Sequence, residues 1–304
     1  MVNLFIPSHV SSGRSTMIKM AWFEAGLLNR YSVEQFMQVL KDFNFDAVHI
    51  NPFKLDANGF QTEIVDGAYQ LCDAVDLYAE QHPNFLKFLV VGGGETYLNY
   101  SLVADFEDRD YIMTISDSGQ NYQATKQLLQ YLKNLNIQTC LSHGLWEGAK
   151  QLIADGLVDY SMSWFYPYFS NVDDSQKLQN NFTIMKGWCE GKAQFLPSMQ
   201  VFGLYNPLTN ITWRFPSSDD LQRELNFLID LNPYGIEWFA PHSGVSQRGE
   251  TFDGFLAHPD VWEIIKNPQK RDLPFEIPPA VIIIAVPIII IVGKKLYDWI
   301  KGRK

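Results

Sequence analysis

The sequence predicts an α/β protein, a (β/α)8 TIM barrel followed by a single C-terminal transmembrane helix. Eight extended apolar segments alternate with amphipathic segments whose apolar residues recur every three or four positions. The eight alternations occupy about 240 residues, which is the size of a TIM barrel and more units than an open doubly wound sheet needs. A charge-free apolar run near the C-terminus, from Ile277 to Gly293, predicts the membrane helix.

Changes in composition along the 304 residues set the expected domain boundaries. We expect an N-terminal extension over residues 1–12 and the TIM-barrel domain over 13–267. A stalk over 268–277 leads into a transmembrane helix over 278–297, and a basic tail over 298–304 closes the chain.

Each predicted strand is an apolar run bounded by polar or turn-forming residues. In chain order, the strands are expected at 17–23, 45–52, 86–92, 111–116, 138–142, 158–166, 194–201 and 235–240. Helical stretches such as SVEQFMQVLKDFN and SSDDLQRELNFLIDL separate them, and HPDVWEIIKN supplies a closing helix. Ser32 with Gln35, and Ser218 with Leu221, have the spacing of helix-capping residues, so two helices should begin there.

The apolar run Ile277 to Gly293 is 17 residues long, close to the minimum that spans a hydrocarbon core of about 30 Å as a helix. The segment after it, KKLYDWIKGRK, carries five basic residues and one acidic residue. Because positive residues stay on the cytoplasmic side, the barrel is expected outside the cytoplasm or on a virion surface. A buried core helix is the alternative interpretation of this run.

The N-terminal residues MVNLFIPSHVSSGRS lack the basic and apolar pattern of an ordinary signal peptide. Three explanations stay open: a leader outside this sequence, a barrel that remains inside, or display by an assembly such as a virion.

Overall composition argues against several classes of protein. Twenty-four basic and 34 acidic residues give a net charge of -10, so a nucleic-acid partner is not expected. Cys72, Cys140 and Cys189 are widely spaced, which indicates neither a disulfide framework nor a CxxC metal site. His143 and His242 belong to no HxH or HExxH motif, so we expect no metal, and no cofactor motif is present.

Barrel enzymes carry their chemistry at the carboxyl ends of the strands, and three carboxylates are candidates there. Asp117 follows the fourth strand, Glu95 follows the third, and Glu237 lies within the eighth. A carboxylate inside a strand is costly unless it is paired or used. Glycosidases need two carboxylates roughly 5 to 9 Å apart, so these three residues are the predicted catalytic set.

Aromatic and polar residues at the same strand ends predict a sugar-binding surface, because sugar rings stack on flat apolar rings with polar edges. The expected substrate-binding residues are Trp22, Glu24, His49, Trp164, Tyr166, Gln200 and Trp238. The alternative is that these aromatic rings only fill the barrel and the helix-facing layer, and that His49 is a satisfied core histidine.

Several strands, taken in order, resemble glycoside hydrolase family 18, the chitinase-like barrels. FDAVHINPF resembles that family's second strand, LKFLVVGGG its third, and VDYSMSWFYPY its sixth. The family's fourth strand carries DxxDxDxE, which in this chain reads DYIMTISD. Asp110 keeps the first position, Met113 and Ile115 replace the inner aspartates, and Asp117 stands at the position of the general acid. The resemblance implies a chitinase-like barrel with a degenerate catalytic motif.

Together these features predict a membrane-anchored, surface-displayed barrel that recognises a polysaccharide or a glycoprotein glycan, with impaired or no hydrolysis. An active glycoside hydrolase that uses Asp117 with Glu95 or Glu237 is one alternative. A structural protein of a membrane or virion surface is the other. Oligomeric state stays open.

Overall fold

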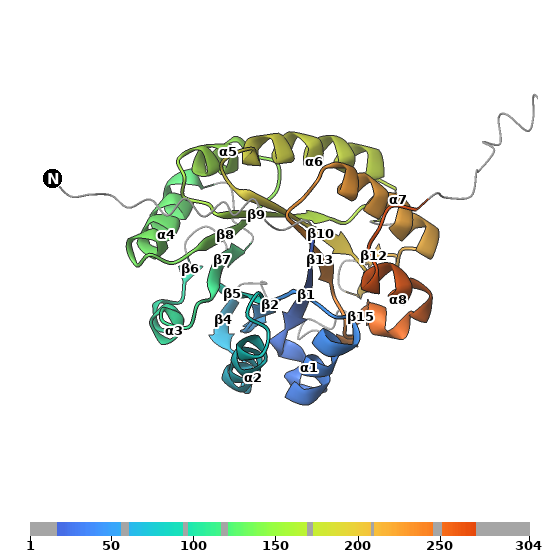
Figure 1. Ribbon diagram of the computed structural model, residues 1–304, viewed down its shortest axis with the longest axis horizontal. Coiled ribbons are helices and arrows are strands. Elements are labelled where there is room, and N and C mark those ends of the chain that lie inside the picture. The colour runs from blue at the N-terminus through green and yellow to red at the C-terminus, as the bar shows by residue number, and fades with distance from the viewer. Residues whose placement is uncertain are drawn as a thin grey trace, which may run out of the picture. The chain divides into compact units, whose positions relative to one another are not determined.

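Eight parallel strands close into a barrel in the described part of the chain (Figure 1). The computed structural model describes residues 17–55, 61–93, 97–116, 121–168, 173–207, 210–245 and 251–271. The barrel strands are β1 (Ile18–Glu24), β2 (Ala47–Asn51), β5 (Leu86–Gly93), β7 (Ile112–Ser116), β8 (Thr139–Ser142), β9 (Tyr160–Phe165), β10 (Gln194–Gln200) and β13 (Gly235–Phe239). The strands follow one another in the order β2-β1-β13-β10-β9-β8-β7-β5, and because β2 also pairs in parallel with β5, the sheet closes on itself.

All eight predicted strands are confirmed, and their ends differ from the expected ones by at most two residues. Apolar runs bounded by turn residues therefore identified the strands of a fully buried parallel sheet. The boundaries of the domains, in contrast, remain predictions.

A helix follows each barrel strand, and the helices surround the barrel in chain order (Figure 1). They are α1 (Val33–Asp42), α2 (Ala68–Glu80), α3 (Tyr100–Phe106), α4 (Tyr122–Asn134), α5 (Glu147–Ala154), α6 (Ser175–Cys189), α7 (Ser218–Asp230) and α8 (Pro259–Lys266). Two short 3-10 helices, η1 (Ala25–Asn29) and η2 (Phe255–Ala257), add to these. The arrangement is a (β/α)8 barrel.

Helix capping follows the sequence in one case and differs by one residue in the other. Ser32 caps α1, and its hydroxyl and the Gln35 side chain form the expected capping box. The helix start predicted at Ser218 is confirmed, because α7 begins at Ser218, but its N-cap is Ser217, which forms a capping box with Asp220. Ser217 has an extended backbone, whereas Ser218 is already helical.

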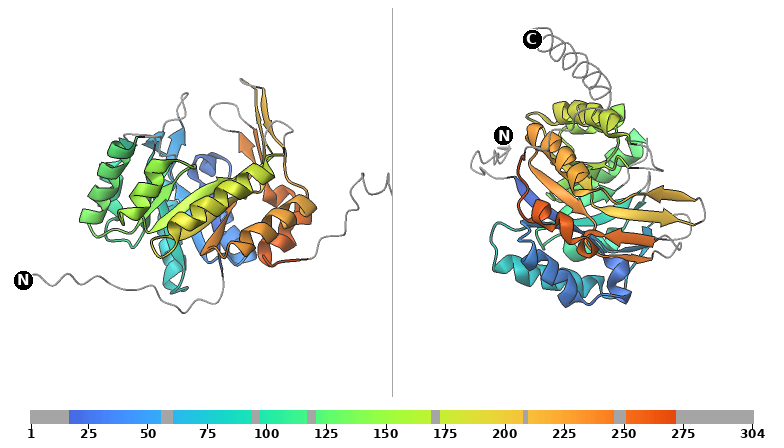
Figure 2. Two further views of the ribbon diagram at one scale, coloured as in Figure 1. Left: turned by 90° about the horizontal axis from the view of Figure 1, so that it is seen from above. Right: turned by 90° about the vertical axis from the view of Figure 1, so that its right-hand side faces the viewer.

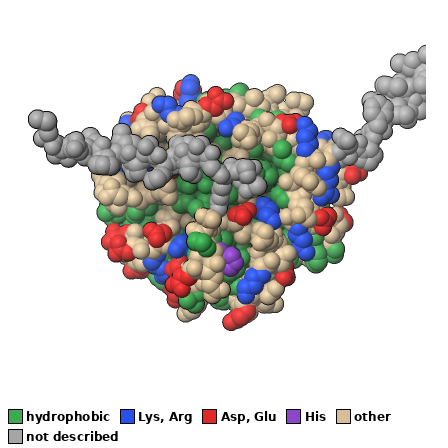
Figure 3. Space-filling view, in the orientation of Figure 1, with side chains coloured by type: hydrophobic (Ala, Val, Ile, Leu, Met, Phe, Trp, Pro, Cys, Tyr) green, Lys and Arg blue, Asp and Glu red, His purple; other side chains and the backbone are tan. Residues whose placement is uncertain are grey.

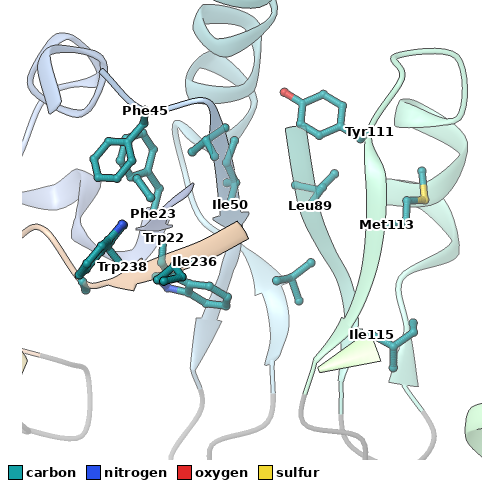
Figure 4. Close-up of a cluster of buried hydrophobic side chains, with 14 of the residues drawn as sticks. Trp22, Phe23, Phe45, Ile50, Leu89, Tyr111, Met113, Ile115, Ile236 and Trp238 are labelled. Atoms are coloured by element: carbon teal, nitrogen blue, oxygen red, sulfur yellow. The ribbon is translucent and has the colours of Figure 1, made fainter. Parts of the chain in front are cut away.

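Buried apolar side chains form two layers on the barrel strands. On the outer face, strand residues such as Phe23, Ile50, Leu89 and Met113 belong to the cluster shared with the helices (Figure 4). A second cluster consists of strand residues that face the interior: Ile18, Met20, Ala47, Phe88, Ile112, Cys140, Tyr160, Met162 and Leu196. The half of the barrel where the strands begin is therefore a filled core.

Short antiparallel strands, absent from the sequence prediction, extend the barrel at the carboxyl ends of its strands. β3 (Phe53–Leu55) and β4 (Gln61–Ile64) form a hairpin after β2, and β6 (Tyr97–Leu98) pairs with β5. A four-stranded sheet consists of β11 (Phe202–Asn206), β12 (Ile211–Trp213), β14 (Gly244–Val245) and β15 (Thr251–Gly254). Figure 2 (left) shows that the β3–β4 and β11–β12 hairpins extend to the same side of the barrel. They form walls beside the strand ends.

The predicted anchor from Ile277 to Gly293 lies outside the described residues, as do the extension and the basic tail. No helix within 17–271, where the structure describes the chain, is long and apolar enough to cross a membrane. On the face drawn in Figure 3, Lys and Arg side chains lie among Asp and Glu side chains rather than in one basic patch.

Candidate functional site

Toward the carboxyl ends of the strands, the barrel interior changes from apolar to polar. The buried polar side chains on the strands there include His49, Asn51, Thr114, Ser116, Ser142, Ser198 and Glu237. Above them, the side chains of Glu24, Trp164, Tyr166 and Phe239 are partly exposed. We call these four residues the barrel mouth. Polar groups that face an opening at this end are the usual setting of a barrel's functional site.

Glu24 is the carboxylate of the barrel mouth, at the end of β1. The Nδ2 atom of Asn51, its register partner on β2, donates to Oε1 at 3.2 Å and to Oε2 at 3.0 Å. The Nε1 atom of Trp22 lies 3.4 Å from Oε2, and the backbone N–H of Gly26 also donates. The Oδ1 atom of Asn51 accepts from the backbone N–H of Phe53 at 3.4 Å, which turns the amide nitrogen toward Glu24.

Burial raises the pKa of Glu24 to about 7, against the lowering effects of Asn51, Trp22 and Gly26. Within the described residues, Glu24 has no cation as an ion-pair partner. A carboxyl group with a pKa near neutrality is present in both protonation states at physiological pH, as proton donors and acceptors in enzymes require.

Glu237 lies deeper in the barrel and is fully buried. Its Oε1 atom is 2.8 Å from Nδ1 of His49, and the His49 ring packs edge-on against Trp22 with 4.5 Å between ring centroids. Glu237 pairs in register with Met20, so Glu24 lies four residues farther along β1, about 13 Å away along the strand. Glu24 and Glu237 therefore lie at different depths of the barrel.

Four aromatic rings form a row that begins beside Glu24. The distance between ring centroids is 5.2 Å from Trp22 to Phe239, 5.8 Å from Phe239 to Tyr166 and 6.1 Å from Tyr166 to Trp213. Trp22 is mostly buried, and the other three rings are partly exposed. The row thus connects the barrel mouth to β12 of the four-stranded sheet.

The far end of this aromatic row borders an open pocket of about 290 Å³. Its lining residues are Tyr166, Asp174, Lys177, Leu178 and Trp213. The rings of Tyr166 and Trp213 stand at 87° to each other and form a corner. Asp174 caps α6 without a side-chain bond to the helix, and Lys177 lies three residues later, so a carboxylate and an ammonium group accompany the rings.

Tyr166 belongs to both the barrel mouth and this pocket. Its hydroxyl lies 3.2 Å from Oγ of Ser198 inside the barrel. Burial, and to a smaller extent the negative charge of Glu237, raise the pKa of Tyr166 well above its ordinary value, so the phenol stays protonated. Trp164 lies on the same face of β9 as Met162, which places it toward the barrel interior.

Two predicted substrate-binding residues lie elsewhere. Trp238 is fully buried in the cluster shared with the helices, because strand alternation turns it outward when Glu237 points inward. Phe239 instead supplies the ring at the barrel mouth. Gln200 is buried, and its amide bonds the backbone of Tyr168, Phe202 and Arg214, which fixes the start of the four-stranded sheet.

Two predicted catalytic residues, Asp117 and Glu95, lie outside the described residues. Asp117 directly follows Ser116, the last residue of β7, and Glu95 follows Gly93, which ends β5. Their roles remain predictions.

His143 and His242 have structural environments. The His143 ring bonds Oγ of Ser161 and the carbonyl of Gly144, and burial lowers its pKa to about 4. His242 packs against Phe36 with 4.3 Å between ring centroids, and burial lowers its pKa to about 4 as well. Across the described segments, His, Cys, Asp and Glu residues form no group of three that could hold a metal ion.

Sequence reasoning missed Trp213, Asp174 and Lys177. Trp213 lies on β12, whereas Asp174 and Lys177 lie at the start of α6, so only the folded chain brings the three residues to one pocket. A lone tryptophan in the loop NPLTNITWRFP was the one available signal.

Comparison with solved structures shows the barrel fold at low sequence identity. The spore cortex-lytic enzyme SleL of Bacillus cereus superposes with a TM-score of 0.52 and 10% identity, covering 82% of this chain and 73% of that chain. The C-terminal domain of a candidate chitinase from Desulfitobacterium hafniense DCB-2 superposes with a TM-score of 0.52 at 10% identity. The match covers 82% of this chain and 98% of that chain. XacCel5A in complex with cellopentaose superposes with a TM-score of 0.50 at 12% identity, and the match covers 83% of this chain and 99% of that chain.

No family model and no curated protein matches the sequence. The chain is therefore a (β/α)8 barrel with structural similarity to glycoside hydrolase barrels.

Proposed function

We propose that this chain recognises an oligosaccharide along the aromatic row, from Glu24 at the barrel mouth to the pocket beside Trp213. The single observation that carries the proposal is the row itself, because partly exposed aromatic rings beside polar groups offer flat apolar surfaces on which sugar rings can stack. Asp174, Lys177 and Glu24 supply the polar partners that orient sugar hydroxyl groups.

More specifically, we propose a chitinase-like barrel of glycoside hydrolase family 18, because strand segments of the sequence resemble strands of that family. Barrels with this architecture include a cortex-lytic enzyme, a candidate chitinase and a protein solved with cellopentaose. In this proposal Asp117, at the position of the family's general acid, and Glu95 remain candidate catalytic residues. A polysaccharide or a glycoprotein glycan is the partner.

We also propose that the apolar run from Ile277 to Gly293 anchors the barrel in a lipid bilayer. The barrel then lies outside the cytoplasm or on a virion surface, with the basic tail inside. Such display would give the aromatic row access to glycans of a cell wall or a neighbouring surface.

The experiment is a glycan array followed by titration calorimetry on the full-length protein in detergent. Trp213→Ala removes the ring at the far end of the row, and we expect at least about fivefold weaker binding of an oligosaccharide hit, or about 1 kcal/mol. Tyr131→Ala is the matched control, because Tyr131 lies near the opposite end of the barrel, in the last turns of α4. An array without a hit, or equal affinities of Trp213→Ala and wild type, would refute the proposal.

A further inference from the structure

Glu24 differs from every other carboxylate that the described site contains. It is partly exposed at the barrel mouth, it is held by hydrogen-bond donors, and it has no cation partner among the described residues. Glu237, in contrast, is fully buried and bonded to His49. Asp174 lies at the far end of the aromatic row, at the N-cap of α6.

The surroundings of Glu24 fix the direction of its carboxyl group. Asn51 contacts both carboxylate oxygens, and Phe53 fixes the orientation of the Asn51 amide. Trp22 covers one side of the carboxyl group and contacts Phe239, the next ring of the row. Glu24 and Phe239 therefore both adjoin Trp22 at the barrel mouth.

We propose that Glu24 is a catalytic proton donor that cleaves a glycosidic bond of the bound oligosaccharide. This inference rests on the proposed glycan recognition and extends it to hydrolysis. A general acid must be held in place where it can reach the bound substrate, and Asn51 and Trp22 hold Glu24 at the partly exposed end of the row. Burial also raises its pKa to about 7, against the lowering effects of its hydrogen-bond donors, which keeps a protonated fraction at neutral pH.

The reaction balances with one water molecule. The Glu24 carboxyl group gives its proton to the glycosidic oxygen, and the bond from that oxygen to the anomeric carbon breaks with the electron pair left on the oxygen. A water oxygen then bonds to the anomeric carbon. The proton that this water loses returns to the Glu24 carboxylate, and two hydroxyl groups replace one glycosidic bond.

Glu24→Gln is the direct test, because glutamine keeps the size and the acceptor oxygen of the side chain and cannot donate a proton as an acid. The full-length protein in detergent is incubated with chitotetraose and with cellopentaose, and the products are quantified by mass spectrometry. We expect kcat to fall at least about 100-fold with KM within about threefold of wild type. Glu80→Gln, at the exposed end of α2, is the matched control and should keep the wild-type rate.

Asn51→Leu provides a readout that a structural role would not change. Its hydrogen bonds lower the pKa of Glu24, so their loss should raise that pKa further. The basic limb of the pH profile of kcat/KM should then move to higher pH. Among the titratable side chains below Glu24, His49 on β2 packs against Trp22, the ring that contacts Glu24, and His49 bonds Glu237 on β13.

The possible outcomes separate the two proposals. If Glu24→Gln keeps its circular dichroism spectrum and glycan affinity and loses cleavage, Glu24 is the proton donor. If the variant cleaves at the wild-type rate, or if the wild type binds glycans and releases no product, the inference fails and glycan recognition stands. If the wild type binds neither probe nor any array glycan, the proposed function itself fails.

Discussion

The Nδ1 atom of His49 lies 2.8 Å from the Oε1 atom of Glu237, and neither side chain is exposed. The two residues come from β2 and β13, the two neighbours of β1, so their bond joins the first and last parts of the barrel. The second polar atom of each side chain, Nε2 and Oε2, has no hydrogen-bond partner in the described structure. Removal of one member of such a buried polar pair strongly lowers the free energy of unfolding, whereas replacement of both by apolar residues changes it little.

This relationship predicts strong coupling between the two residues. Glu237→Met or His49→Phe alone leaves one polar side chain buried without its partner, and each should lower the free energy of unfolding by about 3–5 kcal/mol. The double variant should cost less than the sum of the two, because both polar groups are gone. Urea unfolding of the four proteins, followed by circular dichroism, measures the cycle. Additive costs would show that the bond contributes nothing.

A second prediction concerns acid stability. The pKa of His143 and of His242 is about 4 in the folded protein, below the ordinary value of 6.5. Between pH 6.5 and 4 the unfolded chain binds more protons, so stability falls as the pH falls through this window. His242→Phe should reduce the loss of unfolding free energy between pH 7 and 4 by on the order of 3 kcal/mol. An unchanged loss in this variant would contradict the assignment.

Glu24 should have the opposite effect on acid stability. Its pKa in the folded protein is about 7, above the ordinary value of 4.5, so the folded state binds more protons between these values. Glu24 therefore adds stability as the pH falls from 7 to 4.5. Glu24→Gln removes this gain, and its unfolding free energy should fall more steeply with acid than that of wild type. A shallower fall would refute the raised pKa.

The glycine at the start of β13 should tolerate no side chain. Gly235 pairs with Ile18 on β1, and a Cβ atom at Gly235 would lie 2.0 Å from Cγ1 of Ile18 and 2.8 Å from its carbonyl oxygen. Gly235→Ala should lower the free energy of unfolding by about 1–3 kcal/mol. Gly187 on α6 is the matched control, because a Cβ there meets no atom within 4 Å. Gly187→Ala should stabilise the helix by roughly 0.5–1 kcal/mol in the same unfolding assay.

The barrel could be predicted from the sequence because each of its strands is buried on both faces. Apolar runs such as the one around Ile50 and the one around Leu89 therefore mark the strands without any knowledge of their partners. The four-stranded sheet could not be predicted in this way. Its strands are short and partly exposed, and Tyr205 on β11 is 43% exposed, so no apolar run marks them.

Part of the candidate site followed from the sequence, and part required the register of the strands. Glu24, Trp22 and Tyr166 are at the strand ends where barrel chemistry was expected. Trp238 was predicted to bind substrate together with the catalytic candidate Glu237, although neighbouring strand residues face opposite sides. Once Glu237 is assigned to the interior, alternation sends Trp238 to the helices and Phe239 to the barrel mouth.

The last prediction concerns the membrane anchor. In the full-length protein, the apolar run from Ile277 to Gly293 should keep the chain in the membrane pellet after an alkaline wash. A chain that ends at Lys270 lacks this run and should be released. Ala285→Arg is the sharper test, since a charge near the centre of the run costs about 2.5–3.5 kcal/mol of insertion free energy. Ala257→Arg, which adds the same charge within η2, is the control and should stay in the pellet.

Orientation is tested on the same membranes, in intact cells or particles. The basic residues after the run, among them Lys294 and Lys295, favour a tail inside and a barrel outside. Protease added from outside should therefore remove the barrel and leave a short fragment that an antibody against the tail detects. Protection of the barrel together with loss of the tail would reverse the orientation, and the aromatic row would then face glycans or other ligands on the inner side.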